Sequence, residues 1–135
     1  MDITKILDVS SAGLKAQSDR MRVIAENLAN ASSAASVPGG EPYRRKIVTF
    51  KNVLDREIGV ENVQVDEIKG DQRPFNRRYD PGHPGADKNG YVMMPNVNSL
   101  IEMADMREAQ RGYEANLSMI SMAKEMLRRT IDLLQ

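Results

Sequence analysis

The chain ends with NVNSLIEMADMREAQRGYEANLSMISMAKEMLRRTIDLLQ, residues 96–135, and this stretch has the pattern of one uninterrupted helix. Apolar side chains recur along it at alternating spacings of three and four residues, which is the heptad pattern of helices that pack side by side. The seam positions are Met103, Met106, Gln110, Tyr113, Leu117, Ile120, Lys124, Leu127, Ile131 and Leu134. At about 1.5 Å per residue such a helix is on the order of 60 Å long. It therefore needs an equally long helix beside it to bury its apolar stripe.

The other end of the chain carries a second seam with the same period. Its positions are Ile3, Leu7, Ser10, Leu14, Gln17, Met21, Ile24, Leu28 and Ala31. An isolated amphipathic helix that packs on a local core is an alternative explanation of this pattern. Because both ends of the chain show the same period and a similar length, we favour a pairing of the two terminal helices.

The middle of the chain has the alternation of short strands. Residues 43–51 and 63–66 alternate apolar and polar side chains, and residues 90–94 form a third short run that ends before Pro95. Asn96, Asn98 and Ser99 offer oxygens that can cap the start of the final helix, and Ser99 with Glu102 has the spacing of a capping box.

These patterns predict a mainly α fold, in which long N- and C-terminal helices pair as a coiled-coil hairpin with a small β-rich insert. We place the N-terminal helix of the coiled-coil core at residues 1–33 and a linker at 34–42. The β-rich insert follows at 43–95, and the C-terminal helix of the core occupies 96–135.

Composition excludes several classes of function. The chain has 19 basic and 19 acidic side chains, so its formal net charge of zero argues against nucleic acid as a partner. It contains no cysteine, which removes disulfides, thiolate catalysis and sulfur-based zinc sites. The N-terminus lacks the features of a cleaved signal peptide, and no apolar run reaches the roughly 20 residues of a membrane span. We therefore predict no direct membrane insertion.

Sequence motifs for catalysis, metal or cofactor binding are weak. His83 lies between Gly82 and Pro84, but a single imidazole without a second strong ligand makes a poor transition-metal site. A side chain held in a turn or at a subunit contact explains it better. The segment starting at Asp87 has some residues of a calcium loop but the wrong spacing, so we predict an Asx-type turn that leads into a strand at Tyr91. We predict no catalytic, metal or cofactor site, and no enzyme.

Basic side chains cluster at residues 44–46 and again at 73–78. With aromatic residues nearby these clusters resemble a nucleic-acid surface. Because the net charge is zero, we favour an interface patch that meets acidic neighbours within an assembly.

Several stretches resemble bacterial flagellar axial proteins, the family of rod, hook and hook-associated subunits. Residues 24–30, IAENLAN, resemble the N-terminal motif of that family. Residues 40–46, GEPYRRK, and residues 79–98, YDPGHPGADKNGYVMMPNVN, narrow the resemblance to its proximal rod subunits. The residues that carry the motif are Asn27, Leu28, Ala29, Asn30, Tyr43, Tyr79, Asp80, Pro81, Gly82, His83, Pro84, Gly90 and Tyr91.

The resemblance implies a structural subunit of the basal-body rod that assembles through its terminal helices into a helical, torque-transmitting tube. The implied partners are copies of itself, other flagellar rod proteins, the junction of the MS ring with the rod, and the flagellar type III export apparatus. The implied location is the rod in the periplasmic space of a Gram-negative cell, reached without a cleaved signal peptide.

We predict an assembly interface along the two seams. It consists of Leu7, Leu14, Met21, Ile24, Leu28, Met106, Tyr113, Leu117, Ile120, Leu127, Ile131 and Leu134. Two other classes of protein remain open at this point. One is a cytoplasmic coiled-coil adaptor, or binding module, whose insert recognises a partner, and the other is an enzyme that uses Asp80, His83 and Asp87.

Overall fold

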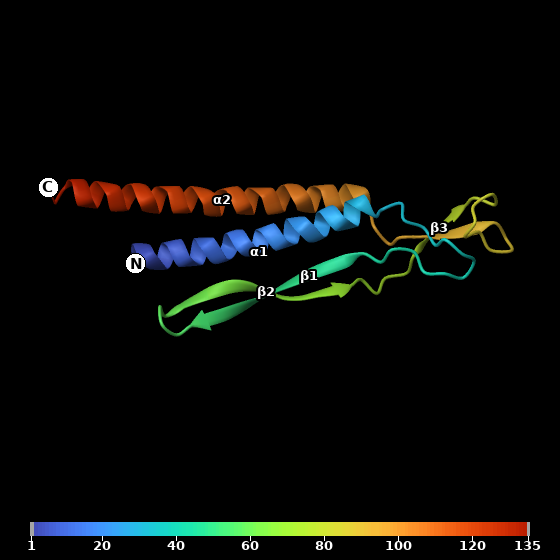
Figure 1. The fold of residues 1–135 in the computed structure, drawn as a ribbon, viewed down its shortest axis with the longest axis horizontal. Helices are drawn as coiled ribbons and strands as arrows, with labels where there is room; N and C mark the ends of the chain where they lie inside the picture. Colours follow the sequence, from blue (N-terminus) through green and yellow to red (C-terminus); the bar gives the residue numbers. More distant parts are fainter. Residues whose placement is uncertain (1, 135) are drawn as a thin grey trace. The chain divides into compact units, whose positions relative to one another are not determined.

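The computed structural model describes residues 2–134, which contain two long helices and two two-stranded antiparallel sheets (Figure 1). In chain order the elements are α1 (Ile3–Ala29), β1 (Lys46–Asp55), β2 (Val60–Gly70), β3 (Asn76–Tyr79), β4 (Tyr91–Met94) and α2 (Ser99–Asp132). β1 pairs with β2 and β3 pairs with β4. None of the helices in residues 2–134 combines the length and the hydrophobicity of a membrane-crossing segment.

The prediction of a mainly α, coiled-coil hairpin fold is wrong. Helices make up 46% and strands 22% of the structure, so the fold mixes α and β structure. The main reason is that β1 and β2 are 10 and 11 residues long and continue well beyond the alternating runs seen in the sequence. In the part of β2 that follows the predicted run, Glu67, Ile68 and Lys69 are all exposed, so no apolar alternation marks these positions in the sequence.

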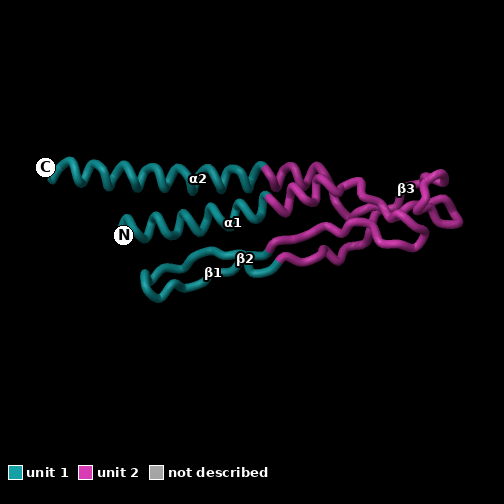
Figure 2. Tube along the Cα trace, viewed as in Figure 1, with its two compact units in different colours: residues 1–21, 49–67, 107–135 teal, residues 22–48, 68–106 magenta. Residues whose placement is uncertain are grey.

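The chain divides into two compact units (Figure 2). Three separate segments form the first unit and two form the second. Unit 1 comprises residues 1–21, 49–67 and 107–135, and unit 2 comprises residues 22–48 and 68–106. The sequence-based division at residues 33, 42 and 95 stays a prediction.

In unit 1 the first part of α1 contacts both the end of the β1–β2 ribbon and α2 (Figure 2). Asn62 of β2 donates a hydrogen bond of 2.6 Å to the carboxylate of Asp8. On its other side α1 approaches α2 at Gly13, where a Cβ would lie 2.7 Å from the Asn116 side chain. The helix α1 is therefore the middle layer of this unit.

Unit 2 has a small core of aliphatic side chains around β4. Val23, Val92 and Val97 are buried, and Ala35 is 1% exposed. The Ala35 amide donates to the carbonyl oxygen of Met93 at 3.2 Å, which places residue 35 along β4. The strands β3 and β4 pair in antiparallel register from Asn76 opposite Met94 to Tyr79 opposite Tyr91.

The turn before β4 has the predicted chemistry. Asp87 Oδ1 accepts hydrogen bonds from the amides of Asn89 and Tyr91, at 2.8 and 3.0 Å. Gly90 has a φ of 84°, a backbone conformation that glycine adopts without steric cost. The predicted Asx-type turn is therefore confirmed.

The start of α2 confirms the predicted cap at Asn98 but not the capping box. The helix begins at Ser99 rather than Asn96, and Asn98 Oδ1 accepts the amides of Leu100 and Ile101 at 3.1 and 3.4 Å. Glu102 is fully buried and faces Arg45 instead of closing a capping box. The capping-box prediction is wrong because Glu102 finds a charged partner far away in the sequence.

Candidate assembly site

Within unit 1, α2 turns small and polar side chains toward α1. Ala109 and Ala123 are almost completely buried, and Gly112 and Asn116 lie between them in the helix. A Cβ on Gly112 would lie 3.1 Å from the Gln17 side chain, so the helices approach closely where side chains are small. Positions 109, 112 and 116 recur at spacings of three and four, one residue out of step with the predicted apolar seam.

Large apolar side chains of α2 point to the outside of the same unit. Leu117 is 48% exposed, and Met119, Met122 and Met126 are similarly exposed. Soluble monomers rarely expose contiguous apolar patches of this kind unless the patch is an interaction site. The small residues of α2 pack inward and several of its large apolar residues face outward, so α2 leaves a large part of its apolar surface exposed.

The predicted interface residues do not form one continuous seam inside the chain. Ile24 is buried. The partly buried members are Leu7, Leu14, Met21, Leu28, Met106, Tyr113 and Ile120. The exposed members are Leu117, Leu127, Ile131 and Leu134. Their role in assembly stays a prediction.

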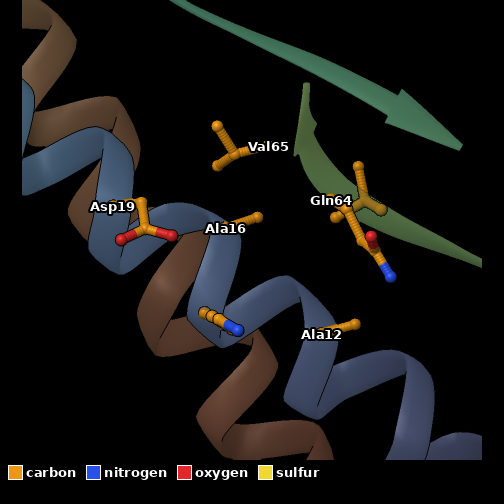
Figure 3. Close-up of a pocket in the computed structure, with 7 residues that line it drawn as sticks. Ala12, Ala16, Asp19, Gln64 and Val65 are labelled. Carbon is orange, nitrogen blue, oxygen red and sulfur yellow. The ribbon is translucent and has the colours of Figure 1, made fainter. Parts of the chain in front are cut away.

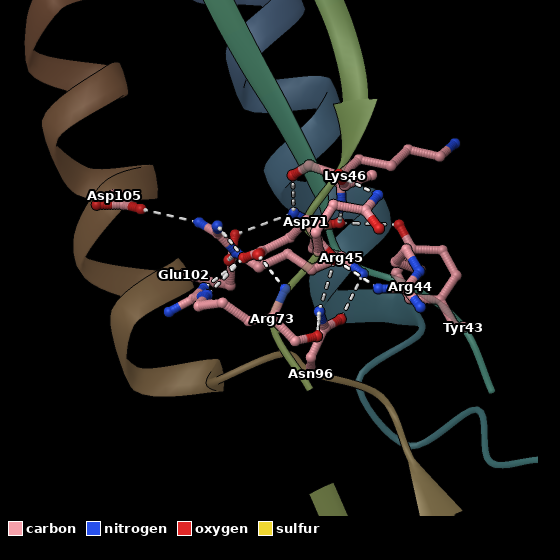
Figure 4. Close-up of polar contacts among 12 residues, drawn as sticks. Tyr43, Arg44, Arg45, Lys46, Asp71, Arg73, Asn96, Glu102 and Asp105 are labelled. Carbon is pink, nitrogen blue, oxygen red and sulfur yellow. Dashed lines mark hydrogen bonds and ion pairs between the residues drawn. The ribbon is translucent and has the colours of Figure 1, made fainter. Parts of the chain in front are cut away.

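Unit 2 contains a polar network that sequence analysis missed, and we call it the Arg45 cluster (Figure 4). Its members are Asn27, Arg45, Asp71, Asn96 and Glu102. Arg45 Nε donates to Glu102, and its Nη1 lies 3.2 Å from Asp71. The side chain of Glu102 is 1% exposed and that of Asp71 is 6% exposed, so these charges are neutralised inside the protein.

Two asparagine side chains of the cluster hold backbone segments together. Asn27 Oδ1 accepts the amide of Lys46 and Asn27 Nδ2 donates to its carbonyl oxygen, each at 2.9 Å. Asn96 Oδ1 accepts the Arg45 amide at 2.8 Å, and its Nδ2 donates to the carbonyl oxygen of Asp71 at 3.0 Å. The side-chain amides of Asn27 and Asn96 thus take the place of a neighbouring strand at the start of β1. Because Asn27 bonds to the backbone in this way, this asparagine of the N-terminal motif is buried.

The other motif residues form the connections of unit 2. The Tyr43 hydroxyl donates to Asn27 Oδ1 at 2.8 Å. His83 Nδ1 accepts the amide of Gly85 at 2.9 Å, so this imidazole is held in a turn as predicted. Tyr79 and Tyr91 pack edge to face with ring centroids 5.4 Å apart, and both rings remain partly exposed.

The basic clusters find acidic partners within the chain itself. Arg45 contacts Asp71 and Glu102, Lys46 Nζ lies 2.9 Å from Glu26, and Arg73 contacts Asp71. Within the chain these three basic residues already have acidic partners, and the predicted contact of the basic clusters with acidic neighbours in an assembly stays a prediction. Arg44 instead lies over the Phe75 ring, 4.3 Å from its centroid.

The acidity of Asp71 follows from its position. Hydrogen bonds from the Arg73 side chain, from the Arg73 backbone amide and from Arg45 lower the pKa of Asp71 to about 2, although burial acts in the opposite direction. A pKa lowered by folding means that the charged carboxylate stabilises the folded state.

We expect the Asp71→Asn substitution to reveal this contribution by its dependence on pH. Because the pKa is depressed in the folded state, the stabilisation by Asp71 is complete above its unfolded value near 4 and is lost as the pH falls toward 2. Urea unfolding of both proteins across this range measures it. The difference in unfolding free energy should shrink as the pH falls, and a constant difference would contradict the assignment.

Within residues 2–134 no three side chains of the His, Cys, Asp and Glu types are grouped to hold a metal ion. The Arg45 cluster is a set of mutually satisfied charges, and its chemistry is structural.

A protein-family model matches the C-terminal part of the chain. The model described as the flagellar basal body rod FlgEFG protein C-terminal matches residues 88–133, which include all of α2. The match covers about a third of the chain and makes this part similar to the rod proteins of the flagellar axial class.

Curated relatives narrow the class further. The flagellar basal-body rod protein FlgC of Agrobacterium fabrum is 53% identical over 127 residues, which cover 94% of this chain and 91% of the relative. FlgC of Salmonella typhimurium is 40% identical over 133 residues, or 98% of each chain, and FlgC of Borreliella burgdorferi is 39% identical across 100% of this chain and 99% of the relative. The chain belongs to the FlgC family of flagellar basal-body rod proteins.

This membership confirms the predicted role as a structural protein of the flagellar basal-body rod. It also agrees with the prediction that the protein is not an enzyme, because the FlgC family is structural. The alternative of a cytoplasmic adaptor receives no support from these relatives.

Proposed function

We propose that this rod protein joins its neighbours through the exposed apolar surface of α2, together with the apolar side chains predicted along α1. The single observation that carries the proposal is the distribution of side chains on α2. The small residues Ala109 and Ala123 are buried, whereas the large apolar residues Leu117, Met122 and Met126 are exposed. Apolar surface left in water by one chain gains free energy when a neighbouring chain covers it. Many such contacts in parallel transmit force without catalytic chemistry.

The assembly that we propose is a helical tube that transmits torque. A subunit whose contacting faces differ joins head to tail, and such contacts generate an open helical array when the rotation does not close. The neighbours in this proposal are copies of the chain, other rod proteins and the junction of the rod with the MS ring.

We place the assembled protein in the periplasmic part of the basal body and propose that the flagellar type III export apparatus delivers it without a cleaved signal peptide. Support for both points comes from membership of the FlgC family and from the motif at residues 79–98.

The Leu117→Asp variant tests the proposed surface. Because Leu117 is 48% exposed in the free chain, we expect the variant to fold normally. Assembly would bury the new carboxylate without a partner, so incorporation into basal bodies and swimming should both be abolished. Complementation of a strain that lacks the protein, followed by purification of basal bodies, measures both effects.

The Ser118→Asp variant is the matched control, since Ser118 is also exposed but does not belong to the apolar surface. It should restore motility. Normal motility of the Leu117→Asp strain would show that this surface does not mediate assembly.

A further inference from the structure

A cleft of about 320 Å³ lies within unit 1 between α1 and β2 (Figure 3). Ala12 and Ala16 of α1 and Val65 of β2 lie around it in Figure 3. Its other lining residues are Lys15, Asp19, Val63 and Gln64. The alanines leave space that larger side chains would fill. A cavity of about 150 Å³ holds one benzene molecule, so this cleft has room for about two aliphatic side chains.

In the same unit the C-terminal end of α2 extends beyond the start of α1. Gly13 lies against Asn116, Gln17 against Gly112, and Arg20 Nη2 is 3.5 Å from Glu108. This antiparallel register places the first residue of α1 opposite Met126. The residues that follow, 127–134, therefore extend past the start of α1 (Figure 1). We call residues 127–134 the C-terminal overhang.

The overhang is apolar and exposed. Leu127 and Ile131 are 45% and 49% exposed, and Leu133 and Leu134 are more than 80% exposed. Leu127 and Ile131 are four residues apart, so their side chains lie on one face of the helix. The two side chains, Leu127 and Ile131, together have about the volume that the cleft can hold.

Charges on the two surfaces are complementary. The segment of the β1–β2 ribbon in unit 1, residues 49–67, contains two basic and five acidic side chains, a net charge of −3. The overhang contains Arg128 and Arg129 against Asp132, a net charge of +1. Charge complementarity of this kind favours the correct encounter and orientation of two surfaces.

We propose that the C-terminal overhang of one copy inserts Leu127 and Ile131 into the α1–β2 cleft of a second copy. Within unit 1, α1 separates α2 from the ribbon, and the register of the helices carries the overhang past the start of α1. The overhang therefore does not enter the cleft of its own chain. The contact joins two different surfaces, so every bound copy presents a further overhang and a further cleft, which is the head-to-tail arrangement of open assemblies. This inference rests on the proposed function and assigns one contact within it.

The Ala12→Leu variant tests the proposal by filling the cleft from within. The leucine enters space that the free chain does not use, so the folded fraction measured by circular dichroism should match that of the parent protein. Because the leucine side chain then occupies the cleft, the overhang of a second copy has no space to bind. Swimming-colony expansion and the amount of the protein in basal bodies should each fall at least tenfold. The Ser11→Leu variant adds the same side chain at the neighbouring exposed position and should behave like the parent.

Cysteine cross-linking gives a second measurement that does not depend on the folding of the Ala12→Leu variant. The chain contains no cysteine, so the double variant Ala12→Cys/Ile131→Cys places one thiol at each surface of the contact. Mild oxidation of cells with assembled flagella should give a ladder of dimers, trimers and larger species. Each disulfide forms from two thiols as the added oxidant accepts two electrons and two protons.

Ser11→Cys/Ile131→Cys serves as the control and should give no ladder. Absence of a ladder in a motile Ala12→Cys/Ile131→Cys strain, or normal assembly of a folded Ala12→Leu protein, would overturn the proposal. If Leu117→Asp abolishes assembly while Ala12→Leu does not, the cleft contact is wrong and the wider rod function still holds.

Discussion

Replacing Glu102 by alanine is expected to lower the free energy of unfolding by about 3–5 kcal/mol, the range measured when one partner of a buried ion pair is removed. Glu102 is fully buried, accepts a hydrogen bond from Arg45 Nε and accepts another from Asn27 Nδ2 at 3.3 Å. Without the carboxylate, the guanidinium of Arg45 stays largely buried with less of its charge neutralised. Urea unfolding of the purified protein at neutral pH measures the loss.

The Glu108→Ala variant provides a control on the same helix. Glu108 also pairs with an arginine, at 3.5 Å from Arg20, but its side chain is 72% exposed. Exposed pairs contribute less than about 1 kcal/mol, so this variant should be nearly as stable as the parent. Equal losses in the two variants would mean that burial does not determine the strength of the Arg45 cluster.

Gly85→Ala is expected to have the second largest effect on stability, a loss of about 1–3 kcal/mol, which is typical of overpacking. A Cβ on Gly85 would collide with the backbone carbonyl group of Ala35, and backbone atoms cannot rotate out of the way. Ala35 is itself held by the hydrogen bond from its amide to Met93. The loop and the segment around residue 35 would have to separate, and this hydrogen bond would weaken.

Amide hydrogen exchange at Ala35 reports this separation directly and should become faster in the Gly85→Ala variant, alongside the loss in urea unfolding. The control comes from the same loop, because a Cβ on Gly82 would meet only Asp80 Oδ1, at 3.9 Å. We expect Gly82→Ala to leave the exchange of Ala35 unchanged. Faster exchange in both variants would show that the loop responds to any added side chain.

The sequence predicted those features of the fold that depend on local pattern. Periodic apolar residues located both helices, and alternation located part of β1 and β2. The Asp87 turn followed from the capacity of aspartate to accept backbone amides nearby in the chain. In each case the residues that determine the structure lie within a few positions of one another.

The Arg45 cluster was missed because its members are far apart in the sequence. Arg45 and Glu102 are 57 positions apart, and the link from Asn27 to Glu102 spans 75. No periodicity marks such pairs, although a buried network of this kind depends on every partner being present. The basic triplet at residues 44–46 was visible in the sequence, but its acidic partners were assigned to other subunits.

Part of the contact between the helices was missed for a different reason. A heptad pattern identifies which positions are apolar, and we assigned these positions both to the pairing of the terminal helices and to assembly with other chains. The contact in unit 1 instead uses Gly13, Gly112 and Asn116, which a search for large apolar residues overlooks. Small residues allow close approach of helix backbones, so the apolar stripe beside them remains available to other chains.

The outward-facing apolar side chains of α2 also change the expected thermodynamics of the protein. The heat capacity of unfolding grows with the apolar surface that becomes hydrated, at about 12–15 cal/mol/K per residue in ordinary globular domains. Side chains such as Leu117, Met122 and Met126 are already hydrated to a large extent in the free chain, so they add little to that quantity. In the proposed assembly a neighbouring chain covers these side chains, so we expect polymerisation to have a negative heat-capacity change and a temperature dependence that the isolated subunit does not show.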